Sequence, residues 1–370
     1  MKILYIHFSL GAGGAERFLV DLANRMATDY NNEVTVLTVF DSNDPSRIHF
    51  LPELSNKIRF INLHQKEGIS LKSIIGIWKT IKKIKPNVVH AHCSFWLILF
   101  PAVFYRKPSY VMTIHSLVQR WAPSKLSRKL TYWLYKDKVQ AITISQVCHQ
   151  SYIDYYHMDN DIIIDNGRES IKTSNKIYAI EQYITALKKS NNTPVFVHIA
   201  RHHPVKNHER LFKTFCRLSE EGIDFQLIVV GDKYEKYLEK FQNHPNIHLV
   251  GKQDNIGDYL IFADYFVLTS DKEGMPITLL EAMSLGITPV CTPAGGIVDV
   301  IEDGKNGYMP SRIDDELYYL TVKKALSERN KISRQYIIDT YESKYSMGIC
   351  AEKYYNVYRR NIYDKEQRRS

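Results

Sequence analysis

Short apolar runs alternate with helix-length amphipathic segments along the whole chain. The runs lie at residues 2–8, 33–39, 87–92, 109–115, 140–145 and 162–165, and then at 195–200, 225–230, 247–250, 265–269 and 288–291. Most of them are continuously apolar, which is the pattern of strands covered on both faces, and such strands are typical of parallel sheets. The sequence therefore predicts an α/β protein with two doubly wound parallel sheets in succession.

A polar, helix-rich segment from residue 169 to residue 192 separates the two series of strands. With 370 residues, the chain is long enough for two domains that each bury a core. We predict an N-terminal domain over residues 1–168, a C-terminal domain over residues 169–345, and a final helical segment over residues 346–370.

Composition favours a globular protein in a reducing compartment. Hydrophobic residues make up 44% of the chain, and the five cysteines are scattered without metal-ligand spacing, which favours a cytoplasmic setting. Residues 1–7 form a strand-like run without the charged region and small-residue cleavage site of a signal peptide. We expect a soluble protein, or one attached to a membrane only at its surface.

The net charge of +9 is concentrated in one region. Residues 68–136 contain twelve Lys or Arg and no Asp or Glu, and they include two basic segments with interspersed Trp, Tyr and aliphatic residues, at 70–85 and 120–138. Such segments are suited to an anionic membrane surface at the inner face of the cell membrane. Alternatively, the aromatic residues face the core and the lysines only solvate the surface. The sequence contains no nucleic-acid-binding motif, so we expect no nucleic-acid partner.

A glycine-rich loop follows the first strand. Gly11, Gly13 and Gly14 precede an amphipathic helix, and a loop of this kind lets the backbone approach a ligand closely. The dinucleotide fingerprint would need a third glycine where Glu16 stands, so NAD binding is excluded. The same loop is common in any doubly wound sheet.

The segment from residue 265 to residue 309 carries the strongest functional signal. A strand-like run ends near Thr269, a polar loop follows, and Pro276 precedes a helix-like run that Gly286 closes. Proline is tolerated in the first turn of a helix, so Pro276 marks a helix start. The N–H groups of Met275, Ile277 and Thr278 then face the loop and offer a site for an anion such as a diphosphate.

Two carboxylates, Glu273 and Glu281, bracket this predicted anion site. A carboxylate repels a phosphate, because both groups are negatively charged. The two carboxylates are better explained if each accepts hydrogen bonds from the hydroxyl groups of a sugar on one side of a diphosphate. In the alternative reading, Glu273 stabilises the helix start electrostatically and Glu281 is a solvated helix residue.

Arg201 and Lys206 follow the first strand of the second series, five residues apart. Two cations at the carboxyl end of a strand can clamp both phosphates of a diphosphate, Arg through its planar fork and Lys as a point charge. The intervening His202 and His203 receive no assignment.

Other histidines and acidic residues occur near strand ends. His115 ends a strand at the carboxyl edge, where α/β sheets bind ligands, although it can equally be structural. His90 and His92 can line the site of an acceptor substrate or bind a metal. No third metal ligand has a suitable spacing, so zinc is not predicted. The run 159–161 is interpreted as a turn.

The motifs together resemble a known family. The run 270–276, with Leu280–Met283, Gly286 and Gly295–Gly296, closely resembles the donor-site signature of retaining GT-B glycosyltransferases of the glycosyltransferase family 4 type, which include bacterial surface-polysaccharide enzymes. The glycine-rich loop resembles the N-terminal loop of the same family. The resemblance implies a GT-B fold, with two Rossmann-like domains facing each other across a cleft and a last helix that crosses back to the first domain.

The resemblance also implies roles for individual residues. Glu273 contacts donor-sugar hydroxyls, Glu281 contacts the ribose, and His115 hydrogen-bonds the donor sugar. The residues expected to touch the donor through their backbones are Gly13, Gly14, Gly274, Met275, Pro276 and Ile277. Arg201 and Lys206 match the family's phosphate-binding pair, so the predicted catalytic group is Glu273, Arg201, Lys206 and His115.

The sequence thus predicts a retaining glycosyltransferase. It is expected to transfer a hexose or N-acetylhexosamine from a nucleoside diphosphate sugar, with UDP favoured over GDP-mannose, to a glycan acceptor linked to polyprenyl diphosphate. Arg201, Lys206 and the helix start supply positive charge, so no metal and no cofactor are expected. The alternatives are a GT-B epimerase, a synthase with a soluble acceptor, or a non-catalytic nucleotide-sugar-binding subunit.

Overall fold

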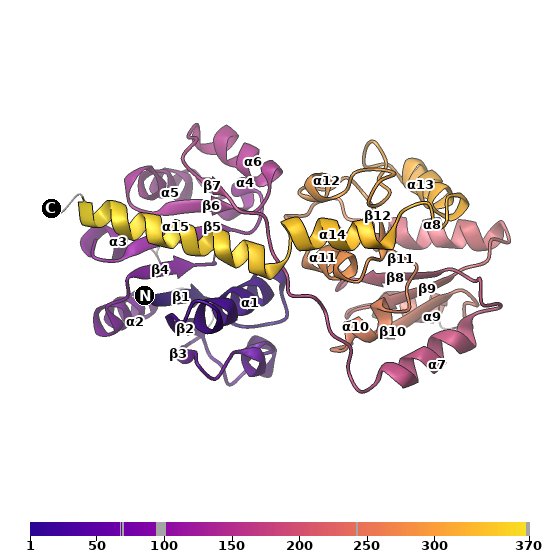
Figure 1. Ribbon diagram of the computed structural model, residues 1–370, viewed down its shortest axis with the longest axis horizontal. Helices are drawn as coiled ribbons and strands as arrows, with labels where there is room; N and C mark the ends of the chain where they lie inside the picture. Colours follow the sequence, from indigo (N-terminus) through magenta and orange to yellow (C-terminus); the bar gives the residue numbers. More distant parts are fainter. Residues whose placement is uncertain (67, 69, 94–100, 242, 368–370) are drawn as a thin grey trace. The chain divides into compact units, whose positions relative to one another are not determined.

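The computed structural model describes residues 1–367 except 67, 69, 94–100 and 242, so part of the basic region 68–136 lies outside the described residues (Figure 1). The chain forms two compact units. Unit 1 comprises Met1–Arg168 with Met347–Ser370, and unit 2 comprises Glu169–Ser346.

Unit 1 is built on a seven-stranded parallel sheet in the order β3-β2-β1-β4-β5-β6-β7. Its strands are β1 (Lys2–His7), β2 (Glu33–Phe40), β3 (Arg59–Gln65), β4 (Val88–Ala91), β5 (Ser109–Ile114), β6 (Gln140–Thr143) and β7 (Ile162–Ile163). The apolar runs of the sequence predict all of these strands except β3. This strand lies at the sheet edge and is only partly buried, so it lacks the continuous apolar pattern.

Two layers of helices cover the faces of this sheet. Along β1, Ile3 and Tyr5 belong to one buried cluster while Leu4 and Ile6 belong to another, because successive side chains of a strand point to opposite faces. The described helices of unit 1 are α1 (Gly14–Thr28), α2 (Leu71–Ile84), α3 (Pro101–Phe104), α4 (Val118–Trp121), α5 (Lys125–Asp137), α6 (Gln146–Tyr156) and α15 (Met347–Gln367), with 3-10 turns at Pro45–Arg47 and Leu51–Glu53.

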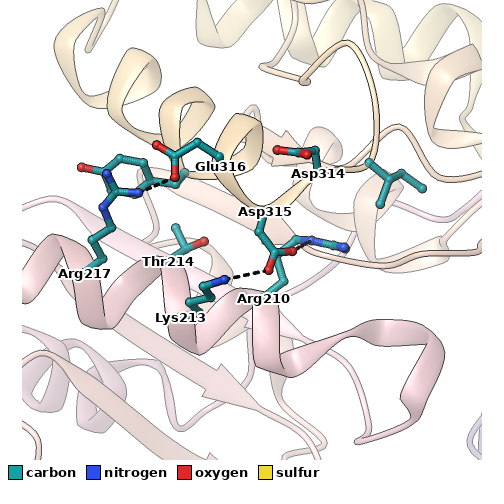
Figure 2. Close-up of a pocket in the computed structure, with 9 residues that line it drawn as sticks. Arg210, Lys213, Thr214, Arg217, Asp314, Asp315 and Glu316 are labelled. Atoms are coloured by element: carbon teal, nitrogen blue, oxygen red, sulfur yellow. Dashed lines mark hydrogen bonds and ion pairs between the residues drawn. The ribbon is translucent and has the colours of Figure 1, made fainter.

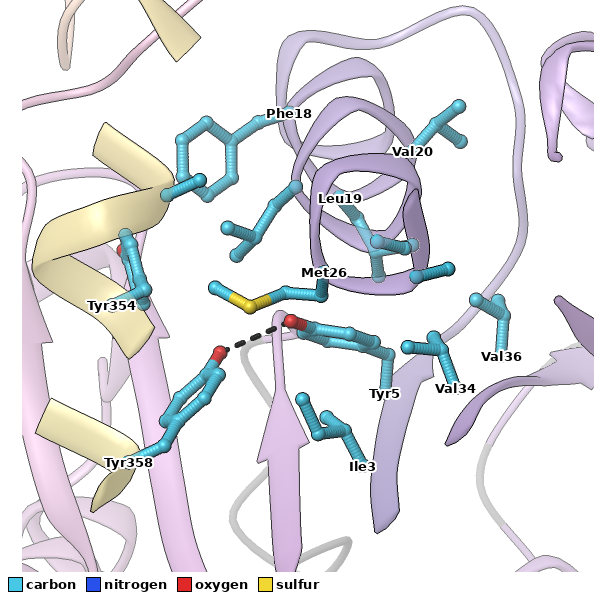
Figure 3. Close-up of a cluster of buried hydrophobic side chains, with 14 of the residues drawn as sticks. Ile3, Tyr5, Phe18, Leu19, Val20, Met26, Val34, Val36, Tyr354 and Tyr358 are labelled. Carbon is cyan, nitrogen blue, oxygen red and sulfur yellow. Dashed lines mark hydrogen bonds between the residues drawn. The ribbon is translucent and has the colours of Figure 1, made fainter. Parts of the chain in front are cut away.

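The last helix, α15, packs in unit 1 beside α1 (Figure 3). The hydroxyls of Tyr5 and Tyr358 are 3.2 Å apart, and Tyr354 lies in the same cluster as Phe18. The other face of the sheet is covered by α2 to α6, whose buried side chains form the second cluster. Both faces of the sheet are thus apolar, as expected for strands that are continuously apolar and do not alternate with polar residues.

Unit 2 contains a five-stranded parallel sheet in the order β10-β9-β8-β11-β12. Its strands are β8 (Val195–Ile199), β9 (Gln226–Val230), β10 (Ile247–Gly251), β11 (Tyr265–Leu268) and β12 (Thr288–Cys291). Its described helices are α7 (Ile177–Leu187), α8 (His208–Glu220), α9 (Glu235–Phe241), α10 (Ile256–Leu260), α11 (Ile277–Ser284), α12 (Ile297–Val300), α13 (Asp315–Ser327) and α14 (Arg334–Lys344), with a 3-10 turn at Pro204–Lys206. The prediction of two parallel α/β sheets is confirmed.

Among the described residues, none of the helices combines the length and the hydrophobicity that crossing a bilayer requires.

Candidate active site

The strand order of unit 2 places the predicted residues at one point of the sheet. The order reverses direction between β8 and β11, and open α/β sheets bind ligands at the carboxyl ends of strands where this happens. Arg201 and Lys206 follow β8, while Glu273 to Ile277 follow β11. The structure therefore brings these two predicted groups to adjacent strand ends.

An ion pair joins the two loops. Lys206 Nζ lies 2.6 Å from Glu273 Oε1, and the hydroxyl of Ser270 donates to the same oxygen at 2.5 Å. The side chains of Lys206 and Glu273 are 22% and 10% exposed. Glu273 therefore contacts a cation of the neighbouring loop. The alternative interpretation, in which Glu273 only stabilises the helix start, did not include this contact.

Backbone hydrogen bonds hold the same loops together. The N–H of Asp271 donates to the carbonyl of Val205 at 2.8 Å, and the hydroxyl of Thr269 donates to the carbonyl of Lys206 at 3.0 Å. The loop after β12 joins them, because the N–H of Gly296 donates to the carbonyl of Gly274 at 2.6 Å. Three strand ends thus support one site.

The start and end of α11 agree with the predicted signals, with one correction. Pro276 is the N-cap residue of α11 and not a residue of its first turn, since its ψ of 123° is extended. At the other end, Gly286 has a φ of +70°, and the N–H groups of Gly286 and Ile287 donate to the carbonyls of Met283 and Ala282. This is a Schellman motif, in which glycine takes the left-handed position.

Glu281 is buried inside unit 2, with 3% of its surface exposed. The alternative reading of Glu281 as a solvated helix residue is therefore wrong.

A second ion-pair network, centred on α8, supports the loop after β11, and the sequence did not predict it. Arg210 of α8 donates to the carbonyl of Thr269 and to Asp271, each at 2.8 Å, and to Asp315 at 2.9 Å. Asn207 also donates to Asp271, at 3.0 Å. The one local sequence signal was Asp271, two residues before Glu273, because Arg210 and Asp315 are distant along the chain.

Arg201 and the two unassigned histidines lie on the loop after β8. Arg201 is exposed. The ring of His202 packs against Tyr237, with centroids 5.6 Å apart, while Nδ1 of His203 accepts a hydrogen bond from the N–H of Val205. Both histidines therefore shape the loop that carries the cations.

A buried histidine pair lies under this loop. His198 Nδ1 donates to the carbonyl of Val267 at 2.9 Å, and its Nε2 lies 3.2 Å from His208 Nε2. Burial is the main cause that lowers the pKa of His198 to about 4. The unfolded chain therefore binds more protons than the folded one between the ordinary histidine pKa of about 6.5 and the folded value.

Acidification should thus weaken unit 2 through His198. We expect the free energy of unfolding to fall by about 2 kcal/mol from this group between neutral pH and about pH 5. His198→Asn keeps a donor for Val267 but does not titrate, so denaturant unfolding at both pH values should show a smaller loss in this variant. Equal losses in both proteins would contradict the assignment.

The predicted residues of the first half of the chain all belong to unit 1. Gly13 is the N-cap residue of α1, and Gly14 is its first residue. His115 directly follows β5 and is half-buried, with its Nε2 3.0 Å from His92 Nδ1. His90 is fully buried between Tyr358 and Thr113, at 2.6 and 2.8 Å. Burial lowers the pKa of all three of these histidines.

The acidic run 159–161 lies in the segment between α6 and β7. His149, Asp159 and Asp161 are close enough together to hold a metal ion. However, His149 Nδ1 lies 3.0 Å from Asp161 and Nε2 lies 3.8 Å from Asp159, so the ring stands between the two carboxylates. The hydroxyl of Thr143 also donates to Asp161, at 2.6 Å. Hydrogen bonds of Asp161 with His149 and Thr143 account for the short contacts.

A charged cavity of about 480 Å³ lies between α8 and α13 (Figure 2). Its cations are already paired: Lys213 and Arg210 contact Asp315, and Arg217 contacts Glu316. Since each positive charge has a carboxylate partner, this cavity has no free cation for a phosphate.

Comparison with known proteins identifies the family. Glycosyltransferase Family 4 matches residues 12–167, and Glycosyl transferases group 1 matches residues 179–342, so the two descriptions cover most of the chain. A UDP-Gal:alpha-D-GlcNAc-diphosphoundecaprenol alpha-1,3-galactosyltransferase of Escherichia coli is 27% identical over 80% of this chain and 81% of that protein.

Two further proteins are similar to the chain, one in part of its sequence and one in its fold. An N-acetyl-alpha-D-glucosaminyl L-malate synthase of Bacillus anthracis is 30% identical, over 40% of this chain and 43% of its own length. The crystal structure of Anabaena HepE in complex with UDP and glucose superposes with a TM-score of 0.76 and 16% identity, over 96% of this chain and 99% of that chain. The chain belongs to the GT-B glycosyltransferases of the family 4 type, and it is a glycosyltransferase.

Proposed function

We propose that the protein is a retaining glycosyltransferase that uses a UDP-sugar to extend a lipid-linked glycan in surface polysaccharide biosynthesis. The observation that carries this proposal is the set of groups at the switch point of unit 2. Arg201 and Lys206 follow β8, Glu273 follows β11 and contacts Lys206, and the start of α11 lies beside them. Gly13, Gly14 and His115 keep the roles that the family resemblance implies.

The proposed chemistry is the departure of a nucleoside diphosphate. Negative charge grows on the β-phosphate as the bond to the sugar breaks, and preorganised positive charge at this position is usually the largest catalytic contribution. Arg201, Lys206 and the N–H groups at the start of α11 are the proposed donors of that charge. With this charge supplied by the protein, we propose a reaction without a metal.

Retention of configuration is proposed to occur by attack on the same face of the sugar, with the departing phosphate accepting the proton of the acceptor hydroxyl. A covalent route would need a carboxylate nucleophile. Glu273 is the nearest candidate, but Lys206 and Ser270 both bind its Oε1. These contacts favour a role in holding donor hydroxyls.

The donor and acceptor classes are proposed from similar proteins. The E. coli relative is named for a UDP-galactose donor and a diphosphoundecaprenol-linked acceptor, and the HepE structure is a complex with UDP and glucose. We therefore propose a UDP-linked hexose or N-acetylhexosamine as donor and a polyprenyl-diphosphate-linked glycan as acceptor.

The test is product analysis with radiolabelled donors. A thermal-shift panel of nucleotide sugars selects the donor, which is then incubated with the protein and a membrane extract. Label should enter the lipid fraction, and NMR of the product should show the anomeric configuration of the donor. Label in a free sugar would favour a soluble-acceptor synthase, a changed donor would favour an epimerase, and no reaction with any donor would favour a non-catalytic subunit.

We further propose that unit 1 binds an anionic membrane surface through the layer formed by α2 to α5. Several large apolar side chains of this layer face solvent, although its Ile77, Ile81 and Tyr135 are buried. The exposed ones are Leu71, Ile75, Phe104, Leu126, Tyr132 and Trp133. Lysines accompany them, and Lys138 Nζ lies 3.9 Å from the ring centroid of Trp133. Basic and apolar groups together are what an interfacial surface requires.

Leu71 and Leu126 offer a direct test of this surface. They are 72% and 67% exposed, so the double replacement Leu71→Gln, Leu126→Gln should leave folding intact but weaken sedimentation with anionic liposomes about ten-fold or more. The matched control is Leu238→Gln, Leu320→Gln, which changes two exposed leucines of unit 2. The membrane proposal is wrong if wild-type protein stays free of anionic liposomes at low salt.

A further inference from the structure

The two phosphate-binding cations of the proposed site differ in what they contact. Arg201 is exposed and makes no ion pair within the described part of the chain. Lys206 is bound to Glu273 at 2.6 Å, and we call this contact the resting pair. A diphosphate can therefore meet Arg201 directly, whereas it competes with Glu273 for Lys206.

Only side chains need to move for the resting pair to separate. The carbonyl of Lys206 accepts the Thr269 hydroxyl, and the preceding carbonyl of Val205 accepts the N–H of Asp271. Around Glu273, Gly274 accepts the N–H of Gly296. The backbones at both ends are thus held, while the Lys206 side chain is 22% exposed to solvent.

Ser270 keeps Glu273 in position when the lysine leaves. Its hydroxyl donates to Glu273 Oε1, the same oxygen that Lys206 contacts. The carboxylate then retains one hydrogen bond, but it loses its only cation in the described structure. An uncompensated, nearly buried carboxylate is unfavourable unless new donors replace the lysine.

We infer that the resting pair makes the site discriminate between the nucleotide sugar and the nucleoside diphosphate product. This inference rests on the proposed donor class. A complete donor replaces the lost contact for both residues. Its diphosphate binds Lys206, and its sugar hydroxyls donate hydrogen bonds to Glu273. The product offers only the diphosphate, so it takes Lys206 and leaves Glu273 without a cation and without new donors. Product binding is thereby weakened relative to donor binding, which favours release after transfer.

Calorimetric titration of the donor and of its diphosphate product tests this inference. Glu273→Gln cannot hold Lys206 by charge, so it should bind the product about ten-fold tighter than wild type, while donor binding is unchanged or weaker. The matched control is Asp271→Asn, which removes one charge from the same loop. Asp271 contacts Arg210 and Asn207, so the resting pair stays intact and product affinity should change less than about two-fold.

A double-mutant cycle distinguishes two effects of Glu273: its contact with Lys206, and direct repulsion between its carboxylate and the phosphates. In a Lys206→Met background no pair exists, so adding Glu273→Gln should no longer strengthen product binding. A full ten-fold gain in that background would mean that Glu273 acts by repelling phosphate, and the inference would be overturned. The same holds if Glu273→Gln binds product no tighter than wild type.

Failure of the proposed donor class has a different signature. If wild-type protein binds no nucleoside diphosphate and no nucleotide sugar, the proposed function fails. If wild type binds both with equal affinity, the donor class survives and the discrimination by the resting pair does not.

Discussion

Lys206→Ala is expected to lower kcat/KM for sugar transfer at least about 30-fold, which corresponds to about 2 kcal/mol of transition-state stabilisation. The lysine is proposed to stabilise charge on the departing diphosphate, and this charge is larger in the transition state than in the bound donor. Steady-state transfer of the radiolabelled sugar measures the effect. Because the interaction strengthens as the bond breaks, the loss should appear in kcat as well as in KM.

The control for this prediction is Lys213→Ala. Lys213 is a 73% exposed lysine of the same unit that pairs with Asp315, whereas Lys206 pairs with Glu273. Transfer by Lys213→Ala should stay within about two-fold of wild type, since surface ion pairs contribute little. Thermal unfolding of both variants separates loss of charge from loss of folding. Near-normal turnover of folded Lys206→Ala would remove the assignment of the site.

Gly295→Ala is expected to abolish measurable transfer and to reduce the free energy of unfolding by about 3 kcal/mol or more. Gly295 has a φ of +56°, and an added Cβ would lie 1.9 Å from the carbonyl oxygen of Glu273. That oxygen belongs to a backbone held by hydrogen bonds, so the loop that presents Glu273 must shift. Denaturant unfolding and the transfer assay measure the two effects.

Gly304→Ala supplies the matched comparison. Gly304 has a φ of +76°, but a Cβ placed there would have no atom within 4 Å. The variant therefore carries only the left-handed strain of about 1 kcal/mol, and its transfer activity should be preserved. If the two alanine variants lose the same stability and both remain active, the close contact between Gly295 and Glu273 does not matter for the site.

Most of the fold could be predicted because its strands are short apolar runs. Most of the strands in unit 1 and unit 2 are buried on both faces, so their sequences are continuously apolar and easy to recognise. The edge strand β3 escaped prediction, since one side of it has no neighbour and its residues are only partly buried. The strands β7 and β10 are also partly buried edge strands, but each lies within an apolar run that was recognised.

The sequence could predict which residue types form the candidate site, but not which of them are buried or in contact. Local signals located the helix start at Pro276 and the glycine that ends α11, because backbone geometry constrains these residue types. The same signals could not show that Glu281 is buried, or that Arg210 supports the loop through Asp271 and Thr269. Both facts depend on elements that are distant in sequence.

The sequence by itself determined the residue types at the switch point, the order of the strands along the chain, and the positions of helix ends, because these depend on neighbouring residues. Only the tertiary structure decided which charges meet. It paired Lys206 with Glu273 and left Arg201 exposed, although both cations occur in the same short segment. The physical reason is that an ion pair depends on a separation of a few ångströms in space, which parallel strands create between residues 67 positions apart.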